Sequence, residues 1–237
     1  MPGPEIFLLA SHNPHKLTEI SLALADVRSA NGSTVRVLDS RCLPPGPEVE
    51  ETGTTFSANA LIKAEAYAQR CLSLPVSERP HWVLADDSGL CVDQLDGAPG
   101  VHSARYAGPI VYQPDNNRKL LAALADVPPQ RRGADFVCVI VVAKVPEKPG
   151  ETIAPLHHVE GRCRGEILPE ARGEGGFGYD PLFWVPSVGK SFAELTREEK
   201  NRVSHRGAAV RALREWLATD FPGTEKMKAP AERNAKK

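Results

Sequence analysis

The chain has 237 residues, with 29 Lys and Arg against 30 Asp and Glu, so its formal net charge is −1. With 41% hydrophobic and 25% charged residues it can build a globular core, which excludes disorder over the whole length. A charge this close to zero argues against a protein that coats nucleic-acid backbone, because such proteins carry a strong basic excess. It does not exclude a small anionic ligand, for which a few local cations are enough.

The five cysteines are odd in number, widely spaced and without a Cys-x-x-Cys pair. We therefore expect buried free thiols rather than a disulfide framework or a zinc site. The N-terminal stretch lacks the basic region of a secretory signal, and the longest apolar run, 136–143, is far short of the ~20 residues of a membrane helix. These features predict a cytoplasmic protein.

Apolar runs predict strands, in chain order, at 6–10, 35–38, 82–85, 136–143, 154–164 and 182–185. Apolar residues at helical spacing predict helices at 14–27, 55–71 and 115–124, and a capping box at Thr196-x-x-Glu199 predicts the start of another. This alternation indicates an α/β fold around one mixed sheet, in one domain or two closely packed lobes over 1–220. Residues 221–237 lack periodicity, which predicts a disordered tail.

The segment Ser11-His12-Asn13-Pro14-His15-Lys16 joins the first predicted strand to the first helix. Free N–H groups and the positive end of the helix dipole at such a junction suit a phosphate. Lys16 falls in the first turn, where side chains lean toward the N-terminus, so its ammonium reaches the same place. The alternative is an ordinary Asn-Pro cap with a solvated lysine.

The segment Asp86-Asp87-Ser88-Gly89 follows an apolar run, which predicts the end of a strand. Adjacent side chains of a strand point to opposite faces, so one carboxylate can bind Mg²⁺ or activate water while the other faces the interior. The alternative is a plain Asp-Ser-Gly turn. Glu50 or Glu51 could add a carboxylate, although a solvated acidic loop is the default interpretation there.

A glycine-rich segment, 175–181, places glycines on both sides of Phe177. Glycine allows a flat ligand to approach the backbone closely, and the Phe177 ring offers a stacking face. Asp180 could accept hydrogen bonds from the N–H groups of a base. The alternative is a glycine-rich turn around a core aromatic residue.

The segment 199–206 carries Lys200, His205 and Arg206. In one unbroken helix Lys200 and His205 would lie about 140° apart, which is poor for a shared site. Ser204 can cap a new helix, so we predict a break there that turns all three side chains toward one pocket. The alternative is a solvated basic helix.

Together these segments strongly resemble the inosine triphosphate pyrophosphatase family, whose members are also called Ham1 or RdgB-type proteins. The resemblance runs from Ile6 to Leu217. It is carried by ordered blocks: Glu51-Thr52-Gly53 with Phe56 and Asn59, Ala85-Asp86-Asp87-Ser88-Gly89-Leu90, Gly97-Ala98-Pro99-Gly100 with Ser103-Ala104-Arg105-Tyr106, Gly176-Phe177-Gly178-Tyr179-Asp180-Pro181, Glu194-Leu195-Thr196 and Ser204-His205-Arg206-Gly207.

The resemblance implies a Mg²⁺-dependent hydrolase that cleaves inosine, deoxyinosine or xanthosine triphosphate (ITP, dITP, XTP) into the monophosphate and pyrophosphate, clearing the nucleotide pool of non-standard purines. It also implies an elongated mixed sheet with two lobes around a central cleft, and a homodimer. Asp87 is the implied catalytic base and metal ligand, with Glu51 on the metal side. The implied substrate-binding residues are Ser11, His12, Asn13, Pro14, His15, Lys16, Lys63, Ser88, Phe177, Gly178, Tyr179, Asp180, Lys200, His205 and Arg206.

The chain departs from the family at the first loop, where relatives often have Thr-Gly-Asn and this chain has Ser11-His12-Asn13. Ser11 keeps the hydroxyl, whereas His12 places a Cβ where glycine could adopt a positive φ. Two rival interpretations stay open. One is a Maf-like pyrophosphatase for other modified nucleotides, and the other is a nucleotide-binding module without catalysis. The intact Asp86, Asp87 and Lys16 count against the module.

Overall fold

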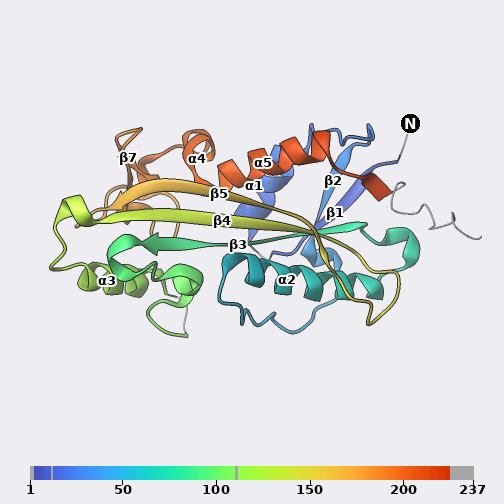
Figure 1. Ribbon diagram of the computed structural model, residues 1–237, viewed down its shortest axis with the longest axis horizontal. Coiled ribbons are helices and arrows are strands. Elements are labelled where there is room, and N and C mark those ends of the chain that lie inside the picture. Colours follow the sequence, from blue (N-terminus) through green and yellow to red (C-terminus); the bar gives the residue numbers. More distant parts are fainter. Residues whose placement is uncertain (1–2, 12, 110–111, 225–237) are drawn as a thin grey trace, which may run out of the picture.

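The computed structural model describes residues 3–11, 13–109 and 112–224 (Figure 1). Its centre is a seven-stranded sheet with the strand order β2-β1-β3-β4-β5-β6-β7. β1 (Glu5–Leu9) pairs in parallel with β2 (Val35–Asp39) and with β3 (Trp82–Val92). The antiparallel strands that follow are β4 (Gly133–Lys144), β5 (Pro155–Ile167), β6 (Phe183–Val185) and β7 (Lys190–Ser191). The predicted α/β class with one mixed sheet is confirmed.

Helices cover both faces of this sheet. α1 (Pro14–Leu24) and α5 (His205–Thr219) lie on one face and α2 (Phe56–Arg70) lies on the other (Figure 1). Strand side chains alternate between the two layers, so Trp82 packs with α1 and α5 while the next residue, Val83, packs with α2. Two apolar layers therefore fix the orientation of the side chains in the first half of β3.

A third apolar cluster occupies the far end of the elongated molecule. It joins α3 (Gln113–Ala123) to the β6–β7 region and lies close to α4 (Arg197–Val203). At its centre the Phe136 ring contacts the rings of Phe183 and Phe192, with centroid distances of 4.7 and 5.6 Å. This cluster supports the glycine-rich segment and α4, both of which carry predicted site residues.

The predicted start of a disordered tail at residue 221 is wrong. The Phe221 ring is 1% exposed and packs against the rings of Trp82 and Trp216. Thr224 donates hydrogen bonds from its backbone amide and its hydroxyl to the Glu5 carboxylate. The sequence did not predict this because one buried aromatic residue, Phe221, has no periodic apolar neighbours that would indicate a helix or a strand. The packed chain extends at least to Thr224, and residues 225–237 lie outside the described part.

All five cysteines are free, as predicted, and Cys71, Cys138 and Cys163 are buried. The predicted burial is wrong for Cys42, which is exposed, and Cys91 is only partly buried. No helix in residues 3–11, 13–109 and 112–224 is long and apolar enough to cross a lipid bilayer.

Candidate active site

A cleft of about 340 Å³ runs between the start of α1, the middle of β3 and the start of α5. Its walls bring together most of the site residues predicted from the sequence. These are Asn13, Lys16, Glu51, Lys63, Asp87, Ser88, Phe177, Gly178, Tyr179, Asp180, Lys200, His205 and Arg206. Ser11 lines a neighbouring cavity of about 400 Å³, which shares Glu51 and Lys63 with the cleft. His12 lies outside the described residues, and the side chains of Pro14 and His15 are not described.

The start of α1 has the predicted capping geometry. Asn13 precedes the helix, and its Oδ1 accepts a hydrogen bond from the Lys16 amide at 3.4 Å. The Ser11 hydroxyl accepts from the Asn13 amide at 3.2 Å. Lys16 lines the cleft, and its Nζ lies 2.7 Å from the Asp86 carboxylate.

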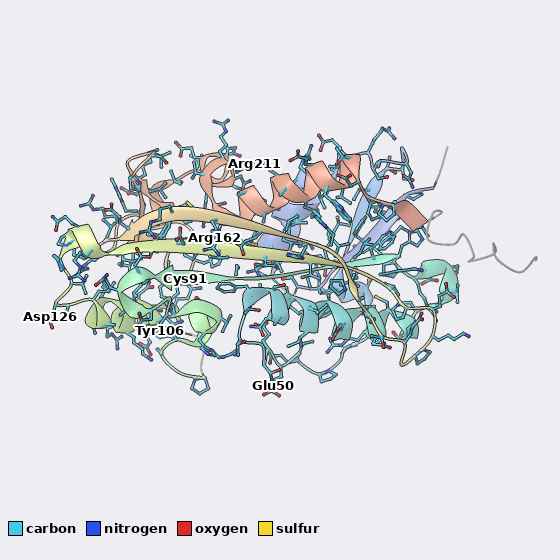
Figure 2. The ribbon with its side chains drawn as sticks, in the orientation of Figure 1. Glu50, Cys91, Tyr106, Asp126, Arg162 and Arg211 are labelled. Carbon is cyan, nitrogen blue, oxygen red and sulfur yellow. The ribbon has the colours of Figure 1, made fainter. Side chains whose placement is uncertain are left out.

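Lys63, on α2, brings a second ammonium to the same end of the cleft. Its Nζ lies 2.9 Å from Glu51 Oε1 and donates to the backbone oxygen of Asp86 at 2.8 Å. Glu51 faces the cleft, whereas Glu50 is exposed at the edge of the molecule (Figure 2). Of the two candidate glutamates, only Glu51 is therefore placed to act in the cleft.

The predicted strand end at Asp86-Asp87-Ser88-Gly89 is wrong. β3 continues to Val92, and both aspartates pair with β4 in its middle, Asp86 opposite Ile140 and Asp87 opposite Val139. A turn-like sequence is held extended because β4 supplies a full antiparallel partner. The alternation predicted for the two carboxylates is confirmed, because Asp86 contacts Lys16 of α1 and Asp87 contacts Asn59 of α2.

The Asp87 carboxylate is largely buried but opens onto the cleft. It accepts hydrogen bonds from Asn59 Nδ2 at 3.1 Å and from the Ser88 amide at 2.9 Å. Burial raises the pKa of Asp87; the nearby charge of Glu51 raises it further, while that of Lys63 lowers it. A carboxyl group with a raised pKa suits a proton acceptor.

The Asp86 carboxylate is fully buried and behaves in the opposite way. Burial alone would raise its pKa, but the charges of Lys16, Arg206 and Lys63 lower the pKa of Asp86 to about 2. It is ionised across the neutral range.

The glycine-rich loop presents Phe177 at the other end of the cleft. Gly176 and Gly178 both have positive φ, 74° and 63°. Asp180 Oδ2 accepts from the Phe177 amide at 2.8 Å and forms an ion pair with Lys200. A Cβ on Gly176 would lie 2.1 Å from the same Oδ2 atom, so this loop requires glycine there. Asp180 therefore holds the loop as well as lining the cleft.

The predicted helix break at Ser204 is confirmed. α4 ends at Val203, and the Ser204 hydroxyl caps α5 by accepting from the Gly207 amide at 3.1 Å. His205 stacks on Phe136 with a centroid distance of 4.7 Å. Burial, aided by the charges of Arg206 and Lys200, places the pKa of His205 well below its usual value. The imidazole is therefore neutral in the folded protein at neutral pH.

Arg206 is buried between α1 and β3. Its Nη1 lies 3.3 Å from Glu19, its Nη2 donates to the Ser88 hydroxyl at 3.4 Å, and its Nε lies 4.0 Å from Asp86. Sequence reasoning missed Glu19. It lies three residues after Lys16, on the same face of α1, and that spacing could have indicated it.

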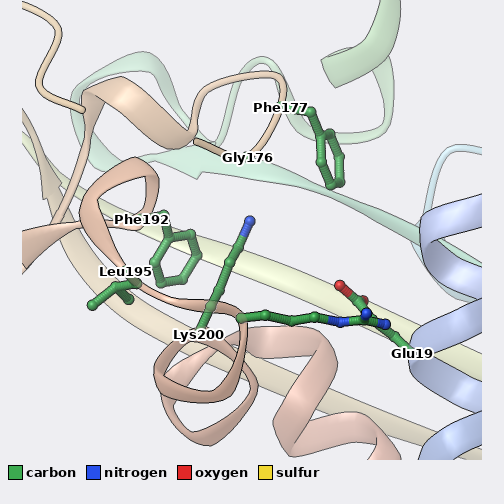
Figure 3. Close-up of a pocket in the computed structure, with 7 residues that line it drawn as sticks. Glu19, Gly176, Phe177, Phe192, Leu195 and Lys200 are labelled. Atoms are coloured by element: carbon green, nitrogen blue, oxygen red, sulfur yellow. The ribbon is translucent and has the colours of Figure 1, made fainter. Parts of the chain in front are cut away.

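A second cavity of about 250 Å³ adjoins the cleft across Phe177 and Lys200. Figure 3 shows the Lys200 ammonium between the rings of Phe177 and Phe192, with the Glu19 side chain reaching in from α1. The Lys200 Nζ lies 5.1 and 5.2 Å from the two ring centroids, which is cation–π distance. Asn116 and Asn117 of α3, also missed from the sequence, support this end, since Asn117 donates to the Gly178 oxygen at 3.1 Å.

The fold and the cleft define an α/β protein with lysines at one end of its site, carboxylates in the middle and an aromatic pocket at the other end. The sequence profile of the Ham1 family matches residues 7–216. The chain belongs to the Ham1 family, which confirms the resemblance seen in the sequence.

Relatives and solved structures agree with this membership. A dITP/XTP pyrophosphatase of Lactobacillus johnsonii is 46% identical over 215 residues, which cover 91% of this chain and 96% of that protein. The structure of a HAM1 protein from Coxiella burnetii matches with a TM-score of 0.73 at 39% identity, covering 90% of this chain and 98% of that one. A nucleoside-triphosphatase / dITP/XTP pyrophosphatase structure from Mycobacterium abscessus gives a TM-score of 0.66 at 40% identity, covering 88% and 98%.

Proposed function

We propose that this protein hydrolyses non-standard purine nucleoside triphosphates, those of inosine, deoxyinosine and xanthosine, between the α- and β-phosphates. The products are the nucleoside monophosphate and pyrophosphate, and the role is to clear such nucleotides from the pool. The observation that carries the proposal is one continuous cleft that joins the Asp87 and Glu51 carboxylates to lysines on one side and to Phe177 on the other. The names of the relatives support the same substrate class.

The lysine end of the cleft suits the triphosphate. Lys16 and Lys63 place two ammonium groups beside the first turn of α1, whose N-terminal dipole also favours an anion. As the bond to the β-phosphate breaks, negative charge grows on the leaving pyrophosphate. The two ammonium groups stabilise that charge, which lowers the barrier.

Asp87 and Glu51 fit a divalent metal ion. In the described part of the chain no group of three or more His, Cys, Asp or Glu side chains forms a complete metal site. Two carboxylates facing one cleft match Mg²⁺, which takes one or two protein carboxylates and completes its shell with substrate phosphates and water. When bound, the ion screens the charge of the phosphates.

In this proposal Asp87 accepts the proton of the attacking water. Hydrogen bonds from Asn59 and the Ser88 amide fix the orientation of its carboxylate, and its raised pKa increases its basicity. The water oxygen forms the new bond to the α-phosphorus, its proton passes to Asp87, and the bridging oxygen leaves with pyrophosphate.

The aromatic end suits a purine that carries a 6-oxo group. Phe177 offers a stacking face, and His205 or Arg206 supplies a hydrogen-bond donor. Adenine presents an amino donor at that position, so two donors would face each other and a buried group would be left unpaired. Guanine keeps the 6-oxo group, so its rejection requires close packing around its 2-amino group.

Replacing Arg206 by Ala tests this assignment. We expect the variant to lose overall activity and also to lose part of the preference for ITP over ATP, because a donor to the 6-oxo group is removed. The measurement is kcat/KM for both nucleotides in both proteins. An unchanged preference would remove Arg206 from base recognition.

The function itself is tested by pyrophosphate release from ITP, dITP, XTP, GTP and ATP, with Mg²⁺ and with EDTA. We expect rapid Mg²⁺-dependent release from the first three. Comparable rates on ATP would defeat the substrate assignment. Release only from other modified nucleotides would favour the Maf-like class, and binding without any release would favour a binding module.

Two further expectations belong to this proposal, the first implied by the sequence resemblance and the second by the composition and apolar runs of the sequence. A homodimer is expected, which sedimentation of the purified protein checks. A cytoplasmic location is also expected, and five free cysteines suit a reducing compartment.

A further inference from the structure

Asp86 is a buried carboxylate that the proposed reaction does not use. It lies in the middle of β3 opposite Ile140, it is 1% exposed, and it does not line the cleft. Burying an ionised carboxylate is costly unless nearby groups compensate for the lost hydration. Its partners therefore indicate what it does.

These partners are cations that face the cleft. One oxygen, Oδ2, lies 2.7 Å from Lys16 Nζ and 4.0 Å from Arg206 Nε. Among the described residues neither carboxylate oxygen accepts a hydrogen bond from a backbone amide, a hydroxyl or a side-chain amide. Lys16 comes from α1 and lies at the phosphate end, whereas Arg206 comes from α5 and lies at the base end.

Glu5 shows how a buried carboxylate outside the cleft is held. It is 2% exposed, and it accepts hydrogen bonds from Trp82 Nε1 at 2.9 Å, the Thr224 amide at 2.9 Å and Asn31 Nδ2 at 3.2 Å. Glu5 is held by neutral donors together with His81, whose Nδ1 lies 3.6 Å from Glu5 Oε2. Asp86 depends instead on the charges of Lys16, Arg206 and Lys63, all of which line the cleft. The contrast indicates that Asp86 serves the site rather than the core.

We propose that Asp86 is a positioning residue that holds Lys16 and Arg206 against one shared oxygen and so couples the phosphate end of the cleft to its base end. An ammonium has three donors, so Lys16 keeps donors for a phosphate while one contacts Asp86. Arg206 Nε lies 4.0 Å from the same oxygen, so Asp86 acts on Arg206 through its charge, while Glu19 and the Ser88 hydroxyl contact the two Nη atoms. The assignment of one end of the cleft to phosphate and the other to the base rests on the proposed function.

Two effects separate when the charge of Asp86 is removed. The cleft becomes more positive, so a ligand recognised by charge alone binds as well or better. A ligand that needs Lys16 and Arg206 in fixed positions binds and reacts less well, because both lose their common anchor. Unfolding of the variant, in contrast, weakens the binding of every ligand to the same extent.

The test is Asp86→Asn, which keeps the shape of the side chain and removes its charge. We expect the affinity for inorganic tripolyphosphate to be unchanged or tighter, and kcat/KM for ITP to fall by roughly 10–100-fold, the scale of a misplaced catalytic group. We also expect the ratio of kcat/KM for ITP over ATP to fall. An unchanged ratio, or tripolyphosphate affinity that falls in step with ITP turnover, would overturn the proposal.

Two variants serve as controls. Glu5→Gln removes a buried carboxylate away from the cleft, and we expect lower thermal stability with an unchanged ITP-over-ATP ratio. Asp86→Glu keeps the charge but moves it by one methylene, and we expect wild-type affinity for tripolyphosphate with a ratio between those of wild type and Asp86→Asn. If Asp86→Asn does not fold, Asp86→Glu serves as the test in its place. An ITP-over-ATP ratio of kcat/KM in Asp86→Glu equal to that of wild type would overturn the proposal.

Calorimetry in EDTA gives a second measure of the preference, the ratio of the Kd values of ITP and ATP, without turnover. If the wild-type protein bound ITP selectively but never hydrolysed it, the proposed function would be wrong. The role of Asp86 could still be tested by the Kd ratio. In that case a selectivity retained by Asp86→Asn would overturn the role of Asp86 independently.

Discussion

The two neighbouring carboxylates of β3 are separated by the alternation of a strand. Asp86 faces cations from α1 and α5, while Asp87 faces Asn59 of α2 and the cleft. The first is therefore held ionised, and the second has a pKa raised by its burial and by Glu51. One residue is suited to holding charges in place and the other to accepting a proton.

Asp87→Asn tests the second role. We expect an intact fold and turnover of ITP lowered by roughly 10²–10⁴-fold, because the amide cannot accept the proton of the water. The measurement is kcat for ITP, with circular dichroism to confirm the fold. Asp93→Asn, just beyond the end of β3 on the exposed surface, is the matched control and should leave kcat unchanged. A rate above half of the wild-type value in Asp87→Asn would remove Asp87 from catalysis.

Lys16→Ala should chiefly weaken nucleotide binding, because its ammonium complements phosphate charge. We expect a larger loss for the triphosphate of inosine than for the monophosphate, as measured by Kd for both. Lys144→Ala, at the end of β4 where it pairs with Trp82, changes a lysine away from the cleft and should alter neither. If both ligands lost affinity equally, Lys16 would not lie on the side of the β- and γ-phosphates.

At the scale of elements, local signals predicted the starts of α1 and α5 well, although α1 ends at Leu24 and not at residue 27 as predicted. Asn13 before α1 and Ser204 before α5 have side chains that cap free amides, a property that the sequence displays directly. The end predicted for the strand at Asp86 was wrong, because pairing with β4 overrides a turn-like sequence. The residues that line the cleft were mostly found by resemblance. The i, i+3 spacing from Lys16 could have indicated Glu19, whereas Asn117 depends on a contact with Gly178, 61 residues away, that no local pattern contains.

The contact between β5 and α5 fixes the position of His205 and Arg206. At Gly161 the helix comes so close that a Cβ would lie 2.1 Å from the His205 oxygen and 2.3 Å from the Ala209 amide nitrogen. We expect Gly161→Ala to push the start of α5 outward, to lower the free energy of unfolding by roughly 1–3 kcal/mol, and to reduce the preference for ITP over ATP.

Urea denaturation and kcat/KM for the two nucleotides check this prediction. Gly3→Ala is the matched control, because a Cβ on Gly3 meets no atom within 4 Å. Stability and preference that both equal those of Gly3→Ala would show that the contact at Gly161 does not set the position of α5.

At the scale of the whole molecule, Glu5 joins the two ends of the described chain. It lies on β1, and through Thr224 it holds the segment that places the Phe221 ring against Trp82. Composition and periodicity could not predict this contact, since its partners are 219 residues apart. The C-terminal segment is therefore part of the core that supports β1 and β3.

Burial acts to raise the pKa of Glu5, but hydrogen bonds from His81, Thr224 and Trp82 lower it from 4.5 to about 2. Because the folded state binds the proton less readily than the unfolded state, the stabilisation is complete above pH 4.5 and is lost as the pH falls toward 2. We expect Glu5→Gln to be less stable than wild type at pH 7 by about 1–3 kcal/mol, since hydrogen bonds to a charged acceptor are weakened. The difference should shrink as the pH falls through that window. Urea denaturation of both proteins in steps from pH 7 to about 3 measures it. A difference that stays constant over the whole range would show that the charge of Glu5 does not hold the C-terminal segment in place.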